Sequence, residues 1–467
     1  MYTIDFQHPI AVHFIGIGGI SMSGLAEILH QEGFRISGSD AKKSDLTEQL
    51  AQKGMTIFYG QRASNIQPDT DLVVYTAAIH EDNPEFAQAK SAGIPMLSRA
   101  DLLGQIMKNY RTSIAVAGTH GKTTTTSMIS QILMDADADP TITVGGIMPS
   151  IHSNLRIGSS QTFVTEACEY TNSFLSFFPT TAVILNIEAD HLDFFKDLED
   201  IRHSFHRFAA LPGQEGLVII NADIENYEEI TAGIPARVLT FGLEQPAMYT
   251  VEDLSWDTKG FPSFTAKRAG ETLGCFSLHL PGLHNVANAL AAIAIADTLS
   301  VPMNSVAETL REFQGADRRF QHKGVCQGIT IVDDYAHHPT EIKATLSAAK
   351  AVDHRELWCI FQPHTYTRTK ALLQDFARAL TLADHVVLAD IYAAREQNTI
   401  GISSDDLRIE IEKLGGDCIY LPSFSQIEEH VLSSCKEGDL LITMGAGNVV
   451  EIGEDLLKHA DAAGGKA

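Results

Sequence analysis

The sequence predicts an α/β fold with three domains, on the evidence of its length, its alternating segments and two glycine-rich turns. A chain of 467 residues corresponds to about three domains of average size. Short apolar runs alternate with helix-length segments in three successive blocks. Two of these blocks open with an apolar run, a glycine-rich turn and a helix. We therefore expect a Rossmann-like N-terminal domain, a central P-loop ATPase-like domain with a mostly parallel sheet, and a Rossmann-like C-terminal domain.

Composition narrows the class of protein. Hydrophobic residues make up 44% and charged residues 20%, as in a soluble globular protein. The net charge of −25 opposes nonspecific binding to nucleic acid. The six cysteines form no CxxC pair, and the chain has neither a basic leader nor an apolar run long enough to span a membrane. We expect reduced thiols, a cytoplasmic location, no nucleic-acid partner and no membrane span.

The first block, residues 1–108, opens with a strand at 10–15, the turn GIGGISMSG and a helix at 25–31. Further strands are predicted at 34–36 and at 71–75. Gly16, Gly18 and Gly19 would let the backbone approach a diphosphate at a helix N-terminus. The third glycine of GxGxxG is replaced by Ser21, which weakens a nicotinamide interpretation, and Asp40 has the spacing of a ribose ligand.

The second block, residues 109–318, contains the most informative motif. The strand-like SIAVAG leads into GTHGKTTTT and a helix at 124–134. Such a loop can hold phosphate oxygens with its amides, while Lys122 neutralises charge and Thr123 binds Mg²⁺. The loop is shorter than GxxxxGK[ST], because position 116 is valine.

Two further strands of this block end in polar groups. QTFVTEA carries Glu166, and TTAVILNIEADH carries Asn186, Glu188, Asp190 and His191. Carboxyl ends of parallel strands share one edge of a sheet, so we expect these groups near Lys122, with Mg²⁺ bound there. A helix at 197–210, strands within 217–280, an Ala-rich helix at 285–299 and a linker at 315–321 follow.

The third block, residues 319–467, again alternates strands with helices, and its last seven residues are predicted to fray. Its strands are expected at 329–333, 357–361, 385–389, 417–421 and 439–443. DDYAHHPTEI and FQPHTYTRTK follow two of them and gather His, Tyr, Asp and Arg at strand ends. Arg318, Arg319 and Arg368 are candidates to offset phosphate or carboxylate charge.

Six motifs occur here in the order typical of one enzyme family. GTHGKTTTT, NIEADHLDFF, LPGLHNVANALAA, GADRRF, DDYAHHPTEI and FQPHTYTRT, preceded by GIGGISMSG, make the chain resemble the Mur ligases of peptidoglycan synthesis over nearly its whole length. The resemblance implies an ATP- and Mg²⁺-dependent enzyme that joins L-alanine to the lactyl carboxylate of UDP-N-acetylmuramate through an acyl phosphate. It also implies a UDP-substrate domain, an ATP domain and a third domain contributing to ATP and amino-acid binding. We expect a monomer or a homodimer.

The resemblance assigns roles to individual residues. Those expected to be catalytic are Lys122, Glu166, His191, His337 and Arg368. Those expected to bind ATP are Gly118, Thr119, His120, Gly121, Lys122, Thr123, Thr124, Asn285, Asn288, Arg319 and Asp334. Those expected to bind the UDP substrate are Gly16, Gly18, Gly19, Ser21, Asp40, Thr76 and Ala77. The metal ligands would be Thr123, Glu166 and His191.

Three departures from the family pattern stand out. The loop EADESDxSFL is EACEYTNSFL here, with Cys168, Tyr170 and Thr171 replacing the usual residues, and Arg395 stands where glycine is common. Residues 197–211 contain no lysine, which favours the L-alanine branch over ligases with a carbamylated lysine.

Four alternatives remain open. A ligase that attaches a recycled tripeptide shares the glycine loop and GTHGKT. A folylpolyglutamate-synthase-like ligase would not need the N-terminal loop, and a nicotinamide oxidoreductase would leave GTHGKT unused. A nonligating nucleotide-binding relative would be expected to lack the catalytic groups.

Overall fold

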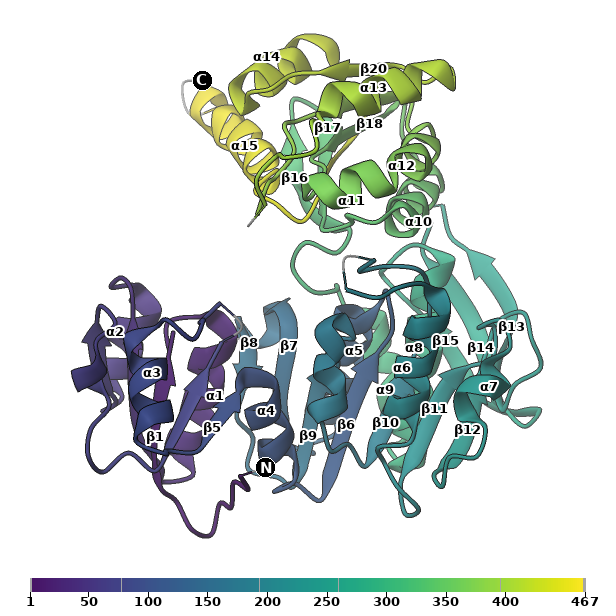
Figure 1. Ribbon diagram of the computed structural model, residues 1–467. Helices are drawn as coiled ribbons and strands as arrows, with labels where there is room; N and C mark the ends of the chain where they lie inside the picture. The colour runs from purple at the N-terminus through teal and green to yellow at the C-terminus, as the bar shows by residue number, and fades with distance from the viewer. Residues whose placement is uncertain (1, 77, 193, 259, 395, 465–467) are drawn as a thin grey trace. The chain divides into compact units, whose positions relative to one another are not determined.

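The computed structural model describes residues 2–76, 78–192, 194–258, 260–394 and 396–464 (Figure 1). The chain forms three sheets of five, ten and six strands. Packing of the backbone divides it into two compact units, the first of residues 1–122, 137–145 and 154–240 and the second of 123–136, 146–153 and 241–467. Among the described residues, no helix is long and apolar enough to cross a membrane.

The N-terminal sheet is entirely parallel. It has the order β3-β2-β1-β4-β5, so that β1 lies where the direction of winding reverses. Its strands are β1 (Ala11–Ile15), β2 (Arg35–Asp40), β3 (Thr56–Tyr59), β4 (Leu72–Tyr75) and β5 (Met96–Ser98). Ligands of open α/β sheets bind at such a switch point, next to the loop that follows β1.

Helices cover both faces of this sheet (Figure 1). They are α1 (Ile20–Gln31), α2 (Asp45–Gln52), α3 (Pro84–Ser91) and α4 (Arg99–Met107), with the short η1 (Ala63–Asn65). Apolar side chains of α1 and α4 pack in the main core, and Ala89 of α3 packs on Ile15 and Val73. A capping box formed by Ser98 and Asp101 begins α4, because each side chain binds the other residue's backbone N–H.

The central sheet is mixed, with the order β15-β14-β13-β12-β11-β10-β6-β9-β7-β8. Its strands are β6 (Thr112–Ala117), β7 (Thr141–Met148), β8 (Ser153–Arg156), β9 (Thr162–Glu166), β10 (Thr181–Ile184), β11 (Leu217–Asn221), β12 (Arg237–Phe241), β13 (Tyr249–Trp256), β14 (Pro262–Arg268) and β15 (Glu271–Ser277). Strand β6 pairs in parallel with both β9 and β10, so the carboxyl ends of these three strands lie at one edge. The helical segments of this part are α5 (Lys122–Asp135), η2 (Pro149–Ile151), η3 (Tyr170–Ser176), α6 (Leu198–Ala209), α7 (Tyr227–Thr231), α8 (Leu283–Thr298) and α9 (Met303–Glu312).

Helix α4 and the turn η3 approach each other very closely. A Cβ atom at Gly104 would lie 1.9 Å from the carbonyl oxygen of Ser176. The Ser176 hydroxyl also donates a hydrogen bond of 2.8 Å to Asp101. Only glycine permits this backbone contact.

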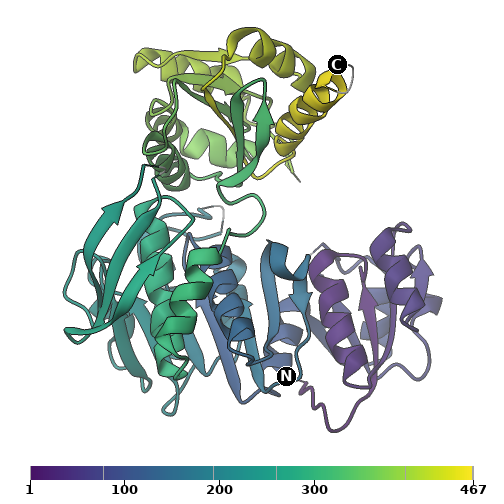
Figure 2. The ribbon, with the colours of Figure 1, turned by 180° about the vertical axis from the view of Figure 1, so that it is seen from behind.

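Strands β13 to β15 form an antiparallel meander that packs against α8 and α9 (Figure 2). Helix α8 is alanine-rich and almost wholly buried. Small side chains let a helix approach a sheet closely, which accounts for the composition of this segment.

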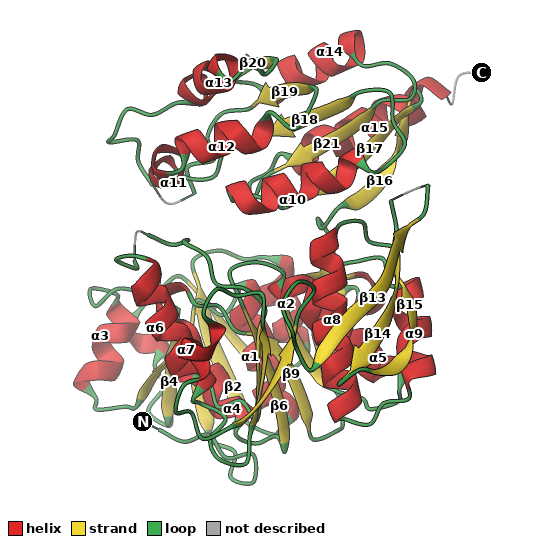
Figure 3. Cartoon of the chain, turned by 90° about the vertical axis from the view of Figure 1, so that its right-hand side faces the viewer, coloured by secondary structure: helices red, strands yellow, loops and turns green. Residues whose placement is uncertain are grey.

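The C-terminal sheet has the order β16-β17-β21-β18-β19-β20 and is parallel except for the pair β16–β17. Its strands are β16 (Gln321–Cys326), β17 (Ile329–Asp334), β18 (Leu357–Phe361), β19 (His385–Leu388), β20 (Cys418–Tyr420) and β21 (Leu440–Met444). Helices α10 (Pro339–Lys350), α12 (Leu373–Leu380) and α13 (Ser404–Lys413) pack on one face (Figure 3). Helices α14 (Phe424–Ser434) and α15 (Val450–Gly464) pack on the other, and α11 (Tyr366–Ala371) is short.

The predicted fold class is confirmed, although the sequence patterns do not indicate every element. Strands β3, β5, β7, β8 and β16 are absent from the expected set. Fraying is predicted from residue 461, but helix α15 continues through Gly464, because the alanines there favour helix. All six cysteines are free thiols, as expected.

Candidate functional site

Residues 118–121, the predicted phosphate-binding loop and called the phosphate loop below, lie between β6 and α5, as the sequence predicts. Gly118 and Gly121 adopt φ angles of +149° and +81°, which other residues rarely adopt. Asn186, beyond the end of β10, accepts a 2.7 Å hydrogen bond from the His120 amide and donates one of 3.1 Å to the His120 carbonyl. The loop is therefore fixed to the neighbouring strand.

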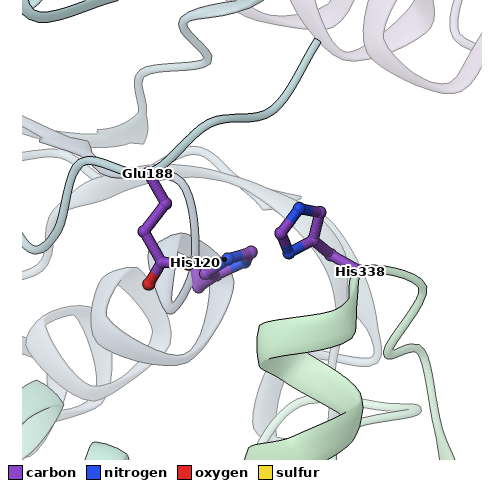
Figure 4. Close-up of side chains that lie close together, drawn as sticks. All are labelled: His120, Glu188 and His338. Carbon is purple, nitrogen blue, oxygen red and sulfur yellow. Dashed lines mark ion pairs between the residues drawn. The ribbon is translucent and has the colours of Figure 1, made fainter. Parts of the chain in front are cut away.

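His120 and Glu188 form an ion pair at this loop. The Nε2 atom of His120 lies 3.5 Å from a carboxylate oxygen of Glu188 (Figure 4). The Glu188 amide donates a hydrogen bond of 2.9 Å to the Thr119 hydroxyl. The NIEADH motif thus holds the phosphate loop by its backbone and by its side chains.

Lys122 is only 16% exposed and is paired with a carboxylate. Its ammonium group donates to the Gly118 and Thr119 carbonyls and lies 3.0 Å from an oxygen of Glu169. Burial alone would lower the pKa of Lys122, but the Glu169 carboxylate outweighs it, and the pKa rises to about 12. Lys122 is therefore a fixed positive charge at the phosphate loop.

His191 lies beside the same carboxylate. Its Nε2 atom is 3.9 Å from Glu169 and 3.7 Å from Asp190, and its ring stacks on Tyr170 with centroids 4.5 Å apart. The backbone at His191 has a φ of +54°, a strained value for a residue other than glycine. The structure thus brings Lys122 and His191 together around Glu169, as the rule for parallel strands predicts.

Glu166 ends β9 and is held by β7. One of its oxygens accepts a 2.6 Å hydrogen bond from the Gly145 amide. A Cβ atom at Gly145 would lie 2.7 Å from the other oxygen. Glycine at position 145 therefore sets the place of this carboxylate.

Thr123 and Thr124 lie in the first turn of α5, where the side chains of both are buried. The amides of a helix's first turn have no partners within the helix. The position of Thr123 directly after Lys122 therefore suits a ligand to phosphate or metal.

A cavity of about 330 Å³ lies in the first unit, between α1, α4, the middle of β7, β8 and the end of β9. Its polar lining residues include Ser21, Arg99, Thr143, Asn154, Thr165 and Glu166. The Arg99 guanidinium donates a hydrogen bond of 3.0 Å to the Ser21 hydroxyl. The cavity therefore joins the end of the glycine-rich turn to the Glu166 carboxylate.

The glycine-rich turn after β1 is tight. Gly16 has a φ of +84°, and a Cβ atom there would lie 2.8 Å from the Thr76 methyl group. The Gly18 amide donates a hydrogen bond of 2.9 Å to Asp40, which therefore supports the turn directly. The ribose contact of Asp40 stays a prediction. Gly19 directly precedes α1, and Ala77 lies outside the described residues.

In the second unit, Asn285 and Asn288 are neighbours on the first turns of α8. The Asn288 amide donates to the Asn285 side chain at 3.2 Å, and Asn285 donates to the Pro281 carbonyl at 2.8 Å. Both side chains are buried. Their amides are thus held in fixed orientations.

The two arginines of the predicted linker have different surroundings. Arg318 binds Asp333 at 2.8 Å and two backbone carbonyls of 445 and 447, so its guanidinium is used to hold the C-terminal domain together. That it also offsets ligand charge stays a prediction. Arg319 lies over the Tyr335 ring and 3.7 Å from Glu341.

Asp334 is buried at the end of β17. It accepts hydrogen bonds from the Phe320 amide at 2.8 Å and from the Ala336 amide at 2.7 Å. Burial raises its pKa to about 6, against the opposing effects of Arg319 and these amides. Asp334 therefore loses its proton much closer to neutral pH than an exposed aspartate does.

A second cluster contains His337, His364 and Arg368. The rings of His337 and His364 lie 5.9 Å apart, and Arg368 lies 3.3 Å from Nδ1 of His364. His337 pairs with Glu341 at 3.3 Å, whereas the neighbouring His338 caps α10. The adjacent histidines thus point in different directions, as expected.

Sequence reasoning missed three residues with evident parts in these sites. Glu169 pairs with Lys122, and its place three residues after Glu166 could have indicated it. Arg99 contacts Ser21 across 78 residues of sequence, and no local pattern signals that contact. Glu396 holds the segment of His364 and Arg368, and its neighbour Arg395 lies outside the described residues.

Known proteins resemble this chain over its whole length. Three family models match consecutive parts: the Mur ligase family catalytic domain over residues 11–111, the Mur ligase middle domain over 116–296 and the Mur ligase glutamate ligase domain over 318–447. The chain is 63% identical to the UDP-N-acetylmuramate–L-alanine ligase of Agathobacter rectalis, covering 98% of this chain and 100% of the relative.

Solved structures of ligases also resemble this chain over nearly its whole length. The crystal structure of the UDP-N-acetylmuramate–alanine ligase of Thermotoga maritima matches with a TM-score of 0.78 and 31% identity, covering 97% of this chain and 100% of that one. A murein peptide ligase of Psychrobacter arcticus matches with a TM-score of 0.68 and 29% identity, covering 96% and 98%. The chain belongs to the Mur ligase family.

Proposed function

We propose that this chain is an ATP-dependent ligase that joins L-alanine to the lactyl carboxylate of UDP-N-acetylmuramate, in the synthesis of peptidoglycan precursors. The observation that carries the proposal is the 63% identity, over the full length, to a relative named for this reaction. The pairing of Lys122 with Glu169 supports it, because it holds an ammonium group in place where phosphoryl transfer needs phosphate charge to be neutralised.

We assign the binding of the three substrates to the three domains. Residues 1–108 bind the UDP part of the substrate, residues 109–318 bind ATP, and residues 319–467 contribute to ATP and amino-acid binding. The protein acts in the cytoplasm as a monomer or a homodimer. The cavity lined by Ser21 and Glu166 supports the first assignment, because a UDP-sugar bound at the glycine-rich turn could extend along it.

The reaction proceeds in two steps. An oxygen of the lactyl carboxylate attacks the γ-phosphorus of ATP, and the bond to the β-phosphate oxygen breaks. ADP is released, and the product is an acyl phosphate. The L-alanine amine then attacks the acyl carbon and loses a proton, and phosphate leaves as the amide forms. Positioning and charge neutralisation dominate phosphoryl transfer, so the fixed ammonium of Lys122 is suited to the transferred phosphoryl group.

The roles of the remaining residues are those that the resemblance to the Mur ligases implies. Glycines 118 and 121 with Thr119, His120 and Thr124 surround the ATP phosphates, and Asn285 and Asn288 face the nucleotide base. Arg319 and Asp334 contact ATP from the third domain. His337 and Arg368 bind the amino acid and the reacting carboxylate.

Thr123 and Glu166 offer oxygen donors that fit Mg²⁺, and His191 is the third ligand that the resemblance to the Mur ligases implies. Carboxylate and hydroxyl oxygens are the ligands this ion prefers, and it commonly takes few protein ligands with substrate phosphates. The backbone amide of Gly145 occupies only one Glu166 oxygen. When bound, Mg²⁺ would neutralise phosphate charge and polarise the phosphoryl group.

The test measures phosphate release from ATP in the presence of Mg²⁺ and UDP-N-acetylmuramate. The acceptors are L-alanine, glycine, L-serine, a tripeptide and none, and mass spectrometry identifies each product. Release that is fastest with L-alanine, together with the mass of the matching amide, is the expected result. Release only with the tripeptide would instead assign the chain to the tripeptide ligases, and no release with any acceptor would overturn the ligase proposal.

A further inference from the structure

The side chain of Glu396 is fastened to the segment that follows β18. One of its oxygens accepts a hydrogen bond of 3.0 Å from the Thr367 amide, and the other accepts one from the Thr367 hydroxyl. Burial alone would raise the pKa of Glu396, but these donors, with the Tyr366 amide and the Thr365 hydroxyl, hold it below its usual range. Glu396 is therefore an anion that organises residues 365–367.

The backbone under this carboxylate is strained. Thr365 has a φ of +63°, which is costly for a β-branched residue. Two hydrogen bonds to the loop that carries Glu396 hold it there. The Thr365 amide donates to the Tyr392 carbonyl at 2.9 Å, and the Tyr392 amide donates to the Pro363 carbonyl at 2.8 Å. A strained residue keeps its conformation only where its surroundings impose it.

The same segment presents Arg368, which is assigned to the amino-acid end of the reaction, and its contact partner His364. His364 directly precedes the strained residue, and its ring stacks on Tyr392 at 5.7 Å. Arg368 lies one residue beyond Thr367 and contacts His364 at 3.3 Å. The direction of both side chains therefore depends on the conformation of residues 364–368.

We propose that Glu396 is a positioning residue for the L-alanine site and acts through residues 364–368. It fixes the turn from which His364 and Arg368 project, and it contacts no substrate itself. This inference rests on the proposed function, because the amino-acid role of Arg368 belongs to that proposal. A small amino acid offers few contacts, so its binding is sensitive to small displacements of the side chains around it.

The experiment compares the wild type with Glu396→Ala and Glu396→Gln. A matched control, Glu429→Gln, changes an exposed carboxylate on α14 of the same domain. The KM of each of the three substrates is measured separately, with thermal unfolding of every variant. Glu396→Ala is expected to raise the KM for L-alanine by about tenfold or more, which is the effect of losing one charge-assisted hydrogen bond between L-alanine and the displaced Arg368.

In the same variant, the KM for UDP-N-acetylmuramate should rise much less than the KM for L-alanine, because most of that substrate is assigned to residues 1–108 and only its carboxylate to Arg368. Glu396→Gln should give a smaller increase for L-alanine, because its amide oxygen can still accept one of the two hydrogen bonds. The control should behave as the wild type. A KM for L-alanine that does not change in Glu396→Ala, or equal increases for all substrates, would overturn the proposal.

A second variant keeps the test decisive if Glu396→Ala does not fold. Thr367→Val removes the hydroxyl donor with little change of shape, and it should raise the KM for L-alanine in the same direction. Combined with Glu396→Gln, its effect on the KM for L-alanine should be less than additive, because both changes weaken the same contact between Thr367 and Glu396. Additive effects would contradict the mechanism. The wild-type assay with L-alanine is run first, so failure of the ligase proposal is seen separately.

Discussion

The ammonium group of Lys122 lies 3.0 Å from the Glu169 carboxylate, and His191 lies 3.9 Å from the same carboxylate. Glu169 is therefore the shared partner of the two groups assigned to phosphate and metal. The Glu169 side chain is only 3% exposed, so water screens its electrostatic interactions with Lys122 and His191 very little. Charge at the phosphate loop thus depends on a residue that binds neither ATP nor sugar in our assignment.

Replacing Lys122 with alanine should abolish ligation and spare binding of the UDP-sugar. We expect kcat to fall by at least about 10²- to 10³-fold, the effect of removing one group that stabilises transition-state charge. The glycine-rich turn after β1 is a separate structure, so calorimetric titration with UDP-N-acetylmuramate should give an affinity near that of the wild type. Loss of both properties would mean that the domain roles are wrongly assigned.

Glu169→Gln should make activity more sensitive to alkali. Without the carboxylate, burial would lower the pKa of Lys122 from about 12, and the lysine would lose its proton at a lower pH. The fall in kcat/KM for ATP as pH rises should therefore begin at a lower pH than in the wild type. The measurement is a profile from neutral pH to about pH 10. An unchanged alkaline limb would contradict the assigned role of the pair.

Gly145→Ala should displace Glu166, because the added Cβ would lie 2.7 Å from its carboxylate oxygen. We expect a lower kcat and a higher Mg²⁺ concentration for half-maximal rate, each changed by about tenfold or more. Gly274→Ala is the matched control. It also lies in a strand, and its nearest neighbour, the Phe276 ring, is 3.5 Å away. Equal behaviour of the two variants would refute the role given to Gly145.

Asp334 should make folding stability depend on pH. Its pKa is about 6 in the folded protein and near 3.8 when unfolded, so the folded state binds this proton more tightly. The stabilisation is complete below the unfolded value and is lost as pH rises through about 6. Relative to Asp334→Asn, the free energy of unfolding of the wild type should fall by at most about 3 kcal/mol over this range.

Urea unfolding of the two proteins at several pH values measures this difference. The backbone amides of residues 320 and 336 each donate to one oxygen of the Asp334 carboxylate. In Asp334→Asn, the side-chain NH₂ group would face one of these two donors, so this variant loses stability by an amount that does not depend on pH. Only the slope of the difference against pH therefore tests the prediction. A difference that does not vary with pH would show that Asp334 titrates normally.

The sequence reveals the elements that carry strong local signals. The turns after β1 and β6 are predictable because glycine, an apolar strand and a helix start coincide there. Strand β8, with the residues SNLR, carries no such signal, since its strand state comes from pairing within the sheet. Strands β3 and β5 have only four and three residues, too few for a period to be recognised.

The same distinction holds for the candidate sites. Lys122, Glu166 and His191 follow strands and could be placed at one edge by the rule for parallel sheets. Glu169 lies beyond the end of β9, where the rule for parallel sheets gives no position, so only its place three residues after Glu166 could indicate it. The pairing of Arg99 with Ser21 depends on how distant helices pack, which no local pattern encodes.

The contact between Gly104 and Ser176 has a mechanical consequence. Helix α4 carries Arg99 at the cavity, and the segment that leads into η3 carries Glu169 beside Lys122. Because the two backbones touch without a side chain between them, neither can shift without moving the other. Any displacement of α4 toward η3 would therefore press on the segment that carries Glu169, so the helix at the cavity and the carboxylate paired with Lys122 belong to one rigid part of the first unit.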